Sequence, residues 1–170
     1  MKKLGFALIA AAALGACSHH SHRVTDEQAN QLHTSPVLTV RGPGFISVAP
    51  EPIVISLREL GKGANAKPIT WRLPAGFRFA AENGIEIVGV VVDGQGVPIK
   101  PDPRVVKDPN PRISREGRNA LACQISEKDR SEFSCRFTER AVPGMYRYNI
   151  RAVDGKGNAV ESDPTIFAMD

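Results

Sequence analysis

The side chains best suited to bind metal or to move protons are the four histidines of this chain, and all four lie near its N-terminus. Neutral imidazole is a good ligand for zinc, copper and nickel. His19, His20 and His22 are therefore the candidate metal ligands. A tight site usually needs ligands held in place by neighbouring groups, so the alternative interpretation is a polar spacer that is rich in histidine.

The sequence contains no recognisable catalytic set. Because every histidine lies at or before His33, a general base in the remaining chain would have to be a carboxylate, a lysine or a tyrosine. We find no Ser-His-Asp combination, no glycine-rich phosphate loop and no carboxylate pair at a helical spacing. A hydrolase that uses two carboxylates is the enzymatic alternative, since such pairs meet only in three dimensions. The sequence predicts a non-catalytic protein without a cofactor.

The most unusual later segment spans residues 99–119 and contains four prolines. Connections of this length without secondary structure are uncommon and are often functional or disordered. Excess positive charge there favours phosphate or carboxylate groups of lipids or cell-wall polymers. The alternative is a solvated crossover between two sheets. Against three acidic residues, the segment carries six cations that form the candidate binding loop: Lys100, Arg104, Lys107, Arg112, Arg115 and Arg118.

The N-terminus has the organisation of an export signal. Lys2 and Lys3 precede an apolar run over residues 4–16. As a helix this run would be about 20 Å long, too short to span a bilayer. Loss of the two lysines with the signal lowers the formal net charge from +4 to +2. Export and the lack of a concentrated basic face exclude nucleic acid as a partner.

The end of this signal resembles the lipobox of bacterial lipoproteins, in the residues Leu14-Gly15-Ala16-Cys17. The resemblance implies that residues 1–16 are removed and that Cys17 receives a diacylglyceryl thioether and an acylated amine. Ser18, in place of the aspartate that retains such proteins in the inner membrane, implies an outer-membrane destination. Two or more acyl chains anchor a protein stably, so membrane lipid is the first expected partner.

Cys123 and Cys135 are predicted to form a structural disulfide. Exported proteins can keep disulfides, and residues 120–125 and 133–137 each alternate in the way of a strand. An antiparallel hairpin that turns through residues 126–131 sets the two cysteines directly opposite each other, at the spacing a disulfide needs. A spacing of twelve without a Cys-x-x-Cys motif disfavours a redox-active pair or a metal site. The same register places Leu121 opposite Phe137 and Ile125 opposite Phe133.

Beyond residue 36 the pattern is that of short strands joined by turns. Fifteen glycines and thirteen prolines suit many tight turns. Seven or eight strands without a long helix predict an all-β sandwich. Besides the two cysteine strands, we expect strands at 37–40, 53–57, 69–73, 85–92, 145–153 and 159–167.

Residues 142–158 resemble the penultimate strand and final hairpin of immunoglobulin-like domains. The resemblance implies that the Tyr146 hydroxyl closes a corner at the start of that strand. Trp71 precedes both cysteines, whereas the tryptophan of true immunoglobulin domains lies between them. The predicted disulfide is therefore a local staple of one hairpin. A transthyretin-like or other small sandwich is the alternative fold.

Together these features predict a signal peptide (1–16), a lipid-anchored flexible tether (17–35) and an immunoglobulin-like β-sandwich (36–170). We expect an outer-membrane lipoprotein that is a non-catalytic binding or adaptor module. Its partner would be another envelope protein or a cell-wall polymer, recognised through loops or a sheet edge. Metal binding by the tether histidines is the alternative function. The functional expectation rests on fold analogy and on the lack of a catalytic set.

Overall fold

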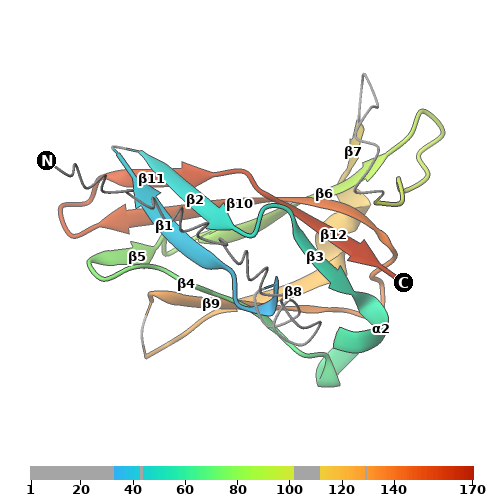
Figure 1. Cartoon of the computed structure of the whole chain (residues 1–170), viewed down its shortest axis with the longest axis horizontal. Helices are drawn as coiled ribbons and strands as arrows, with labels where there is room; N and C mark the ends of the chain where they lie inside the picture. The colour runs from blue at the N-terminus through green and yellow to red at the C-terminus, as the bar shows by residue number, and fades with distance from the viewer. Residues whose placement is uncertain (1–32, 43, 102–111, 129) are drawn as a thin grey trace, which may run out of the picture.

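The chain folds almost entirely into β-strands, which confirms the all-β prediction. A computed structural model describes residues 33–170 except 43, 102–111 and 129. Its helical segments are short and include α2 (Leu57–Leu60), η1 (Gly63–Asn65) and η2 (Arg115–Ala120). The strands (Figure 1) are β1 (Val37–Arg41), β2 (Phe45–Ala49), β3 (Ile53–Ser56), β4 (Ile69–Arg72), β5 (Phe77–Phe79), β6 (Ile85–Val92), β7 (Arg112–Ser114), β8 (Leu121–Ile125), β9 (Glu132–Phe137), β10 (Gly144–Asp154), β11 (Ala159–Ser162) and β12 (Thr165–Met169).

Strand β10 organises the sheet because its eleven residues are enough to pair with four other strands. One of its edges pairs with β11 and β12, and the opposite edge pairs with β6 and β5, all antiparallel. The sheet continues from β12 to β3, and from β11 through β2, β1, β4 and β9 to β8. Among the described strands, β3 and β8 end the longest path of neighbours, and β5 and β7 likewise have a hydrogen-bonded neighbour on one side only.

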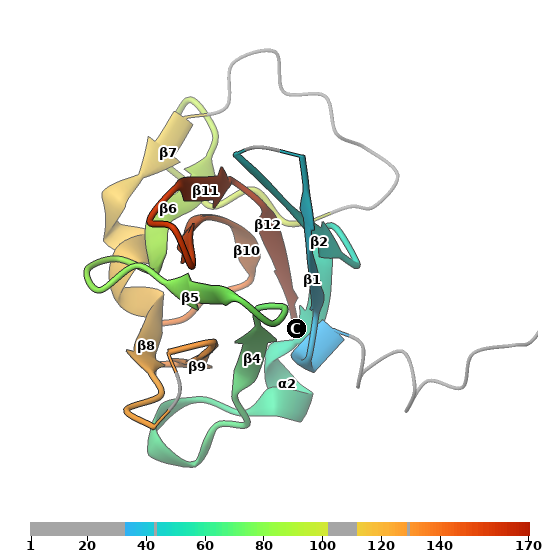
Figure 2. The same ribbon diagram turned by 90° about the vertical axis from the view of Figure 1, so that its left-hand side faces the viewer.

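The sheet curls on itself (Figure 2). Aromatic side chains of non-neighbouring strands meet in the core that it encloses. Trp71 of β4 and Tyr148 of β10 are fully buried, with ring centroids 5.5 Å apart. Trp71 Nε1 donates a hydrogen bond of 3.3 Å to the Tyr148 hydroxyl, which gives both buried polar groups a partner. Burial raises the pKa of Tyr148, so this hydroxyl stays protonated. Such contacts join strands that are not neighbours in the sheet across the core.

The β8–β9 hairpin has the predicted register. Cys123 lies opposite Cys135, with Cα atoms 4.0 Å apart and the two sulfurs bonded. Ser126 N donates to Glu132 O, so these two residues form a hydrogen-bonded pair. Hydrogen-bonded and non-hydrogen-bonded pairs alternate along an antiparallel ladder, which makes Cys123 and Cys135 a non-hydrogen-bonded pair. The other two predicted pairs are also present, Leu121 with Phe137 and Ile125 with Phe133.

Tyr146 makes the corner contact that the resemblance implied. Its hydroxyl donates to Val142 O at 2.6 Å and accepts from Val142 N at 3.1 Å. Burial raises the pKa of Tyr146, partly offset by the hydrogen bond with the Val142 backbone. The contact fixes the turn that leads into β10 and places the inward face of that strand over the core.

The structure corrects the prediction for residues 99–119. They were expected to form one structureless connection, but Arg112–Ser114 pairs with β6 as β7, and Arg115–Ala120 is the 3₁₀ helix η2. The Ser114 hydroxyl accepts a hydrogen bond of 3.4 Å from Glu116 N at the start of this helix. The high charge of the segment concealed the serine cap and the three-residue strand.

The strand count and the last strand also differ from the prediction. The expected strand at 159–167 is two strands, β11 and β12, separated at Asp163 and Pro164. Pro164 has no N–H to donate to the ladder, which interrupts pairing with β10. β2, β5 and β7 were not predicted, so the described residues hold twelve strands and not seven or eight.

Candidate functional site

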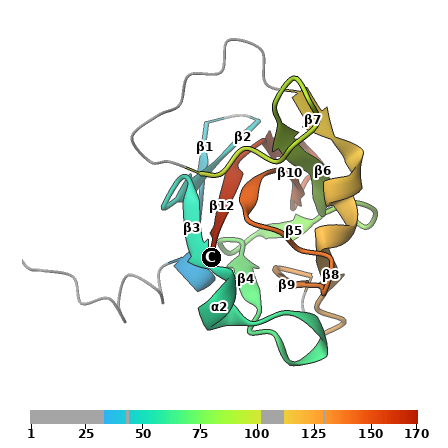
Figure 3. The ribbon, with the colours of Figure 1, turned by 90° about the vertical axis from the view of Figure 1, so that its right-hand side faces the viewer.

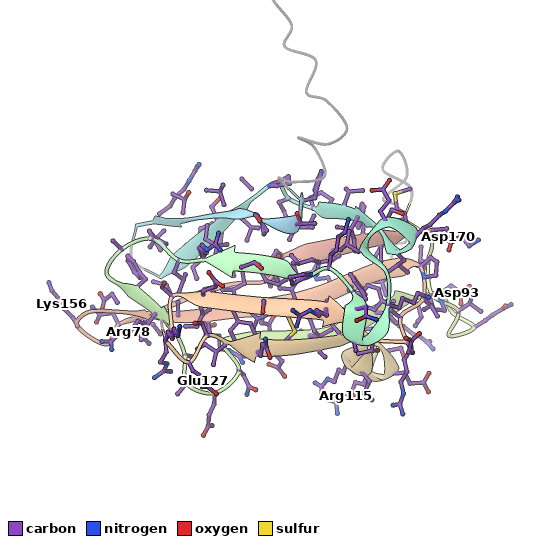
Figure 4. The ribbon with its side chains drawn as sticks, turned by 90° about the horizontal axis from the view of Figure 1, so that it is seen from below. Arg78, Asp93, Arg115, Glu127, Lys156 and Asp170 are labelled. Carbon is purple, nitrogen blue, oxygen red and sulfur yellow. A yellow bond between two sulfur atoms is a disulfide. The ribbon has the colours of Figure 1, made fainter. Side chains whose placement is uncertain are left out.

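Four of the six cations predicted to form a binding loop lie in the described residues. Arg112 is exposed on β7, and Lys100 is exposed on the segment that follows β6. Arg115 and Arg118 are exposed on η2, where Arg115 projects away from the strands (Figure 4). The other two cations, Arg104 and Lys107, lie outside the described residues.

Two glycines let η2 lie directly on β6. A Cβ atom on Gly117 would lie 2.5 Å from Val90 N and 2.8 Å from Val90 Cβ. Gly89, with a φ of 155°, faces the Ser114 carbonyl in the same way and has no room for a side chain. Because backbone meets backbone here, η2 holds a fixed position between β7 and β8.

Arg118 uses its charge to hold η2 on β6. Its Nε donates to Val88 O at 3.2 Å, and its guanidinium lies 3.9 Å from a Glu86 carboxylate oxygen. Glu86 is shared with Arg151 of β10 at 3.0 Å. Lys100, Arg112 and Arg115 have no ion-pair partner among the described residues.

Three other arginines on the outer faces of the strands have partners. Arg147 pairs with Asp163 at 2.9 Å, and Arg72 pairs with Glu132 at 2.7 Å. Arg136 Nε donates to Ala66 O at 3.1 Å. Exposed ion pairs of this kind contribute little stability, so these side chains mainly cover the outer surface of the strands.

Strand β8 pairs with β9 on one side and with no described strand on the other. The N–H and C=O groups of Ala122 and Gln124 bond to β9. Because these groups alternate in direction along a strand, those of Leu121, Cys123 and Ile125 point away from β9. Among the described residues these outward groups have no hydrogen-bond partner. They form an unpaired strand edge at the periphery of the molecule (Figure 2).

A groove of about 700 Å³ runs along the outer face of the β8–β9 hairpin. Gly63 and Ala64 of η1 form one wall, while the side next to β8 has no described strand beyond it. Figure 4 shows Arg115 and Glu127 near the two ends of β8. The residues that line the groove include polar ones, among them Gln124, Arg136 and Arg140, and the apolar Leu121 and Phe137.

The edge at β3 is closed by a side chain. Val54 N, on the side of β3 away from β12, donates to His33 Nδ1 at 2.9 Å. Burial lowers the pKa of His33, which favours the neutral ring that can accept this bond. Just before β3, the Glu51 carboxylate accepts from Thr165 N at 2.8 Å, and burial raises the pKa of Glu51. His33, predicted near the end of the tether, therefore makes a specific contact with the sandwich.

The remaining predicted sites fall outside the described residues. These are the lipidated Cys17 and the candidate metal ligands His19, His20 and His22. In the part of the chain that the structure describes, no three histidine, cysteine or acidic side chains gather closely enough to hold a metal ion. No helix in that part is both long and apolar enough to cross a membrane.

Comparison of the chain with known protein families, curated proteins and solved structures finds no match.

The open edge of β8 was not predicted, although the hairpin was. Its only signal in the sequence is that residues 121–125 carry no charge, proline or glycine. Natural edge strands usually carry such features as protection against pairing. Sequence alone did not indicate that β8 is an edge strand, because that depends on β9 pairing with β4 on its other side.

Proposed function

We propose that this protein is a lipid-anchored lipoprotein of the bacterial outer membrane that acts as a non-catalytic binding module. The anchor is supported by the lipobox-like residues that end at Cys17 and by the charged start and short apolar run before them. The disulfide between Cys123 and Cys135 is consistent with an exported protein.

We further propose that the domain is an immunoglobulin-like sandwich. Three observations support this: the Tyr146 corner, the parallel pairing of β3 with β12, and a second layer in which β1, β4, β9 and β8 are consecutive neighbours. These neighbours match the order expected of one immunoglobulin sheet, and β6, β10 and β12 match the other. The hairpin disulfide is a departure from that family.

The observation that carries the binding role is the unpaired edge of β8 beside the groove on its hairpin. A free strand edge supplies backbone donors and acceptors in a fixed row, and side chains of the groove select what approaches. Arg115 and Arg112 extend the polar surface beyond the start of β8. Such a surface suits a polypeptide or a polymer that carries carboxylates.

The anchor is tested by feeding cells an alkyne-labelled fatty acid and detecting the label on the protein. We expect strong labelling of the natural chain and none of a Cys17→Ser variant. The His22→Ala variant is the matched control, because it alters a nearby residue without touching the thiol, and it should label normally. Equal labelling of the Cys17→Ser variant would overturn the anchor.

The binding role is tested by photo-crosslinking in cells, with p-benzoylphenylalanine at Gln124 or at Arg115. Thr39, exposed on β1 between β2 and β4, is the control position. We expect discrete adducts with a defined partner, which can be a second copy of this chain, from Gln124 at several times the yield from Thr39. Equal yields of heterogeneous products from all three positions would contradict the binding role.

A further inference from the structure

The residues of β8 carry no charge that would repel a second copy of the same strand. Residues 121–125 carry no charge, so two such strands can approach without like charges opposing each other. Nothing in the strand blocks pairing, because it contains no proline, glycine or lysine. The β3 edge offers no comparable surface, since the N–H of Val54 is already bonded to His33.

A two-fold axis at Cys123 satisfies the geometry of an antiparallel ladder. Cys123 then faces Cys123 of the second copy, and Leu121 faces Ile125. These residues are the ones whose N–H and C=O groups point away from β9. All the outward groups of both strands can therefore bond at once, and Ala122 comes to lie opposite Gln124 of the second copy.

Pairing in this register also extends the core. Cys123 and Ile125 face inward but are only partly buried, because no strand covers their outer side. Leu121, at the other end of the strand, is already buried, with 6% of its surface exposed. A second β8 would bring apolar side chains of the same kind against this uncovered margin and remove it from water.

We propose that two copies of this protein associate in the membrane by antiparallel pairing of their β8 strands, which joins their sheets across a two-fold axis. The contact between the two β8 strands, which we call the seam, comprises five residues per copy. It is small compared with interfaces that are stable in dilute solution. The dimer therefore depends on confinement of both copies to one surface, which raises their effective concentration. In this respect it rests on the proposed lipid anchor.

The seam is tested in cells with the full-length protein that carries p-benzoylphenylalanine at Gln124. In the proposed register this side chain lies against Ala122 of the second copy, so irradiation should give a covalent species of twice the mass. We expect at least tenfold more of this species from Gln124 than from Thr39. Comparison of reducing and non-reducing gels verifies the intact Cys123–Cys135 bond in each variant.

A lysine at the seam provides the decisive variant. Ala122→Lys places two like charges close to the axis on exposed positions, and we expect it to lower the covalent dimer from Gln124 at least fivefold. Thr39→Lys adds the same charge on an exposed position of β1 and should leave the yield within twofold. The two variants separate an effect at the seam from an effect of net charge.

The outcomes separate this proposal from the proposed function. A covalent dimer that is insensitive to Ala122→Lys, or no dimer above the Thr39 yield, overturns self-pairing. An adduct of Gln124 with a different envelope protein also overturns self-pairing, while the binding module stands. Fatty-acid labelling of the same samples reports on the anchor. Absence of that label with a persistent dimer would refute the anchor and the dependence on confinement, while the pairing of β8 strands would stand.

Discussion

The strands β3 and β8 are both edges of the sheet, but one is closed and the other is open. Figure 3 shows them on opposite sides of the molecule. At β3 the imidazole of His33 accepts the outward N–H of Val54, and the inward Ile53 and Ile55 are buried. At β8 the outward backbone groups have no partner among the described residues, and the inward Cys123 and Ile125 are only partly buried.

The two edge strands differ in how each is held in place. The β3 edge lies where the described chain begins, so a side chain from that segment can close it. The β8 edge lies far from that segment and is held by its hairpin partner and the disulfide instead. An unprotected edge is a liability unless it has a use, and this contrast is the reason we propose β8 as the side of the molecule that meets a partner.

The largest expected effect comes from removing the disulfide, which holds the open edge in place. The Cys123→Ala/Cys135→Ala variant should lose about 3 kcal/mol of unfolding free energy, because a closed loop of this size restricts the unfolded chain. Urea unfolding followed by tryptophan fluorescence measures the loss. An unchanged midpoint would mean that β8 is held without the staple.

A second effect tests how η2 positions β8. Gly117→Ala would place a Cβ within 2.5 Å of Val90 N, and we expect a loss of roughly 2 kcal/mol as η2 moves off β6. Gly94→Ala is the matched control, since a Cβ there has no neighbour within 4 Å and the backbone is not left-handed. Thermal unfolding should separate the two variants by several degrees, and equal melting temperatures would contradict the close contact.

The third prediction concerns the hydrogen bond between Val54 N and His33 at the β3 edge. His33→Ala removes the acceptor of the Val54 N–H, and we expect a loss of about 1 kcal/mol, typical of one hydrogen bond. Hydrogen exchange at Val54 should accelerate to rates like those of the β8 edge. An unchanged Val54 rate would show that the imidazole does not close β3.

The same contact predicts a dependence on pH. Because burial lowers the pKa of His33 from 6.5 in the folded state, the unfolded chain binds the proton first as the pH falls. The contribution of His33 is fully present above pH 6.5 and is lost progressively as the pH falls through the lowered pKa. Chemical denaturation of the natural chain and the His33→Ala variant at pH 7.5 and pH 5 should show a smaller difference at pH 5. A larger stability difference between the two proteins at pH 5 than at pH 7.5 would contradict this prediction.

The sequence predicts local pairing well and distant pairing poorly. The alternation around Cys123 and Cys135 is sufficient for the register of the hairpin, and alternation also buries Trp71, Tyr146 and Tyr148. β2 was missed because it lies between a glycine-rich turn and Pro50, and β5 because it has three residues. The open edge depends on which strands pair across long separations, and the closure by His33 depends on a contact 21 residues away.

The smallest expected effect is on stability at the seam itself. Ala122 is exposed, so Ala122→Lys should change the unfolding free energy of the monomer by no more than about 0.5 kcal/mol. Denaturation of the Cys17→Ser form, which lacks the proposed lipid, measures this without any contribution from pairing. A loss of several kcal/mol would show that Ala122 supports the fold, and its use as a seam variant would then fail.

Hydrogen exchange resolved by residue, in the lipidated protein on vesicles and in the Cys17→Ser form in dilute solution, tests the contrast between the edges most directly. Val54 should be protected in both preparations, because His33 closes its edge within one molecule. The amides of Cys123 and Ile125 should exchange fast in dilute solution and at least tenfold more slowly on vesicles, where the β8 strands pair. Equal and fast exchange of these two amides in both preparations would contradict the account.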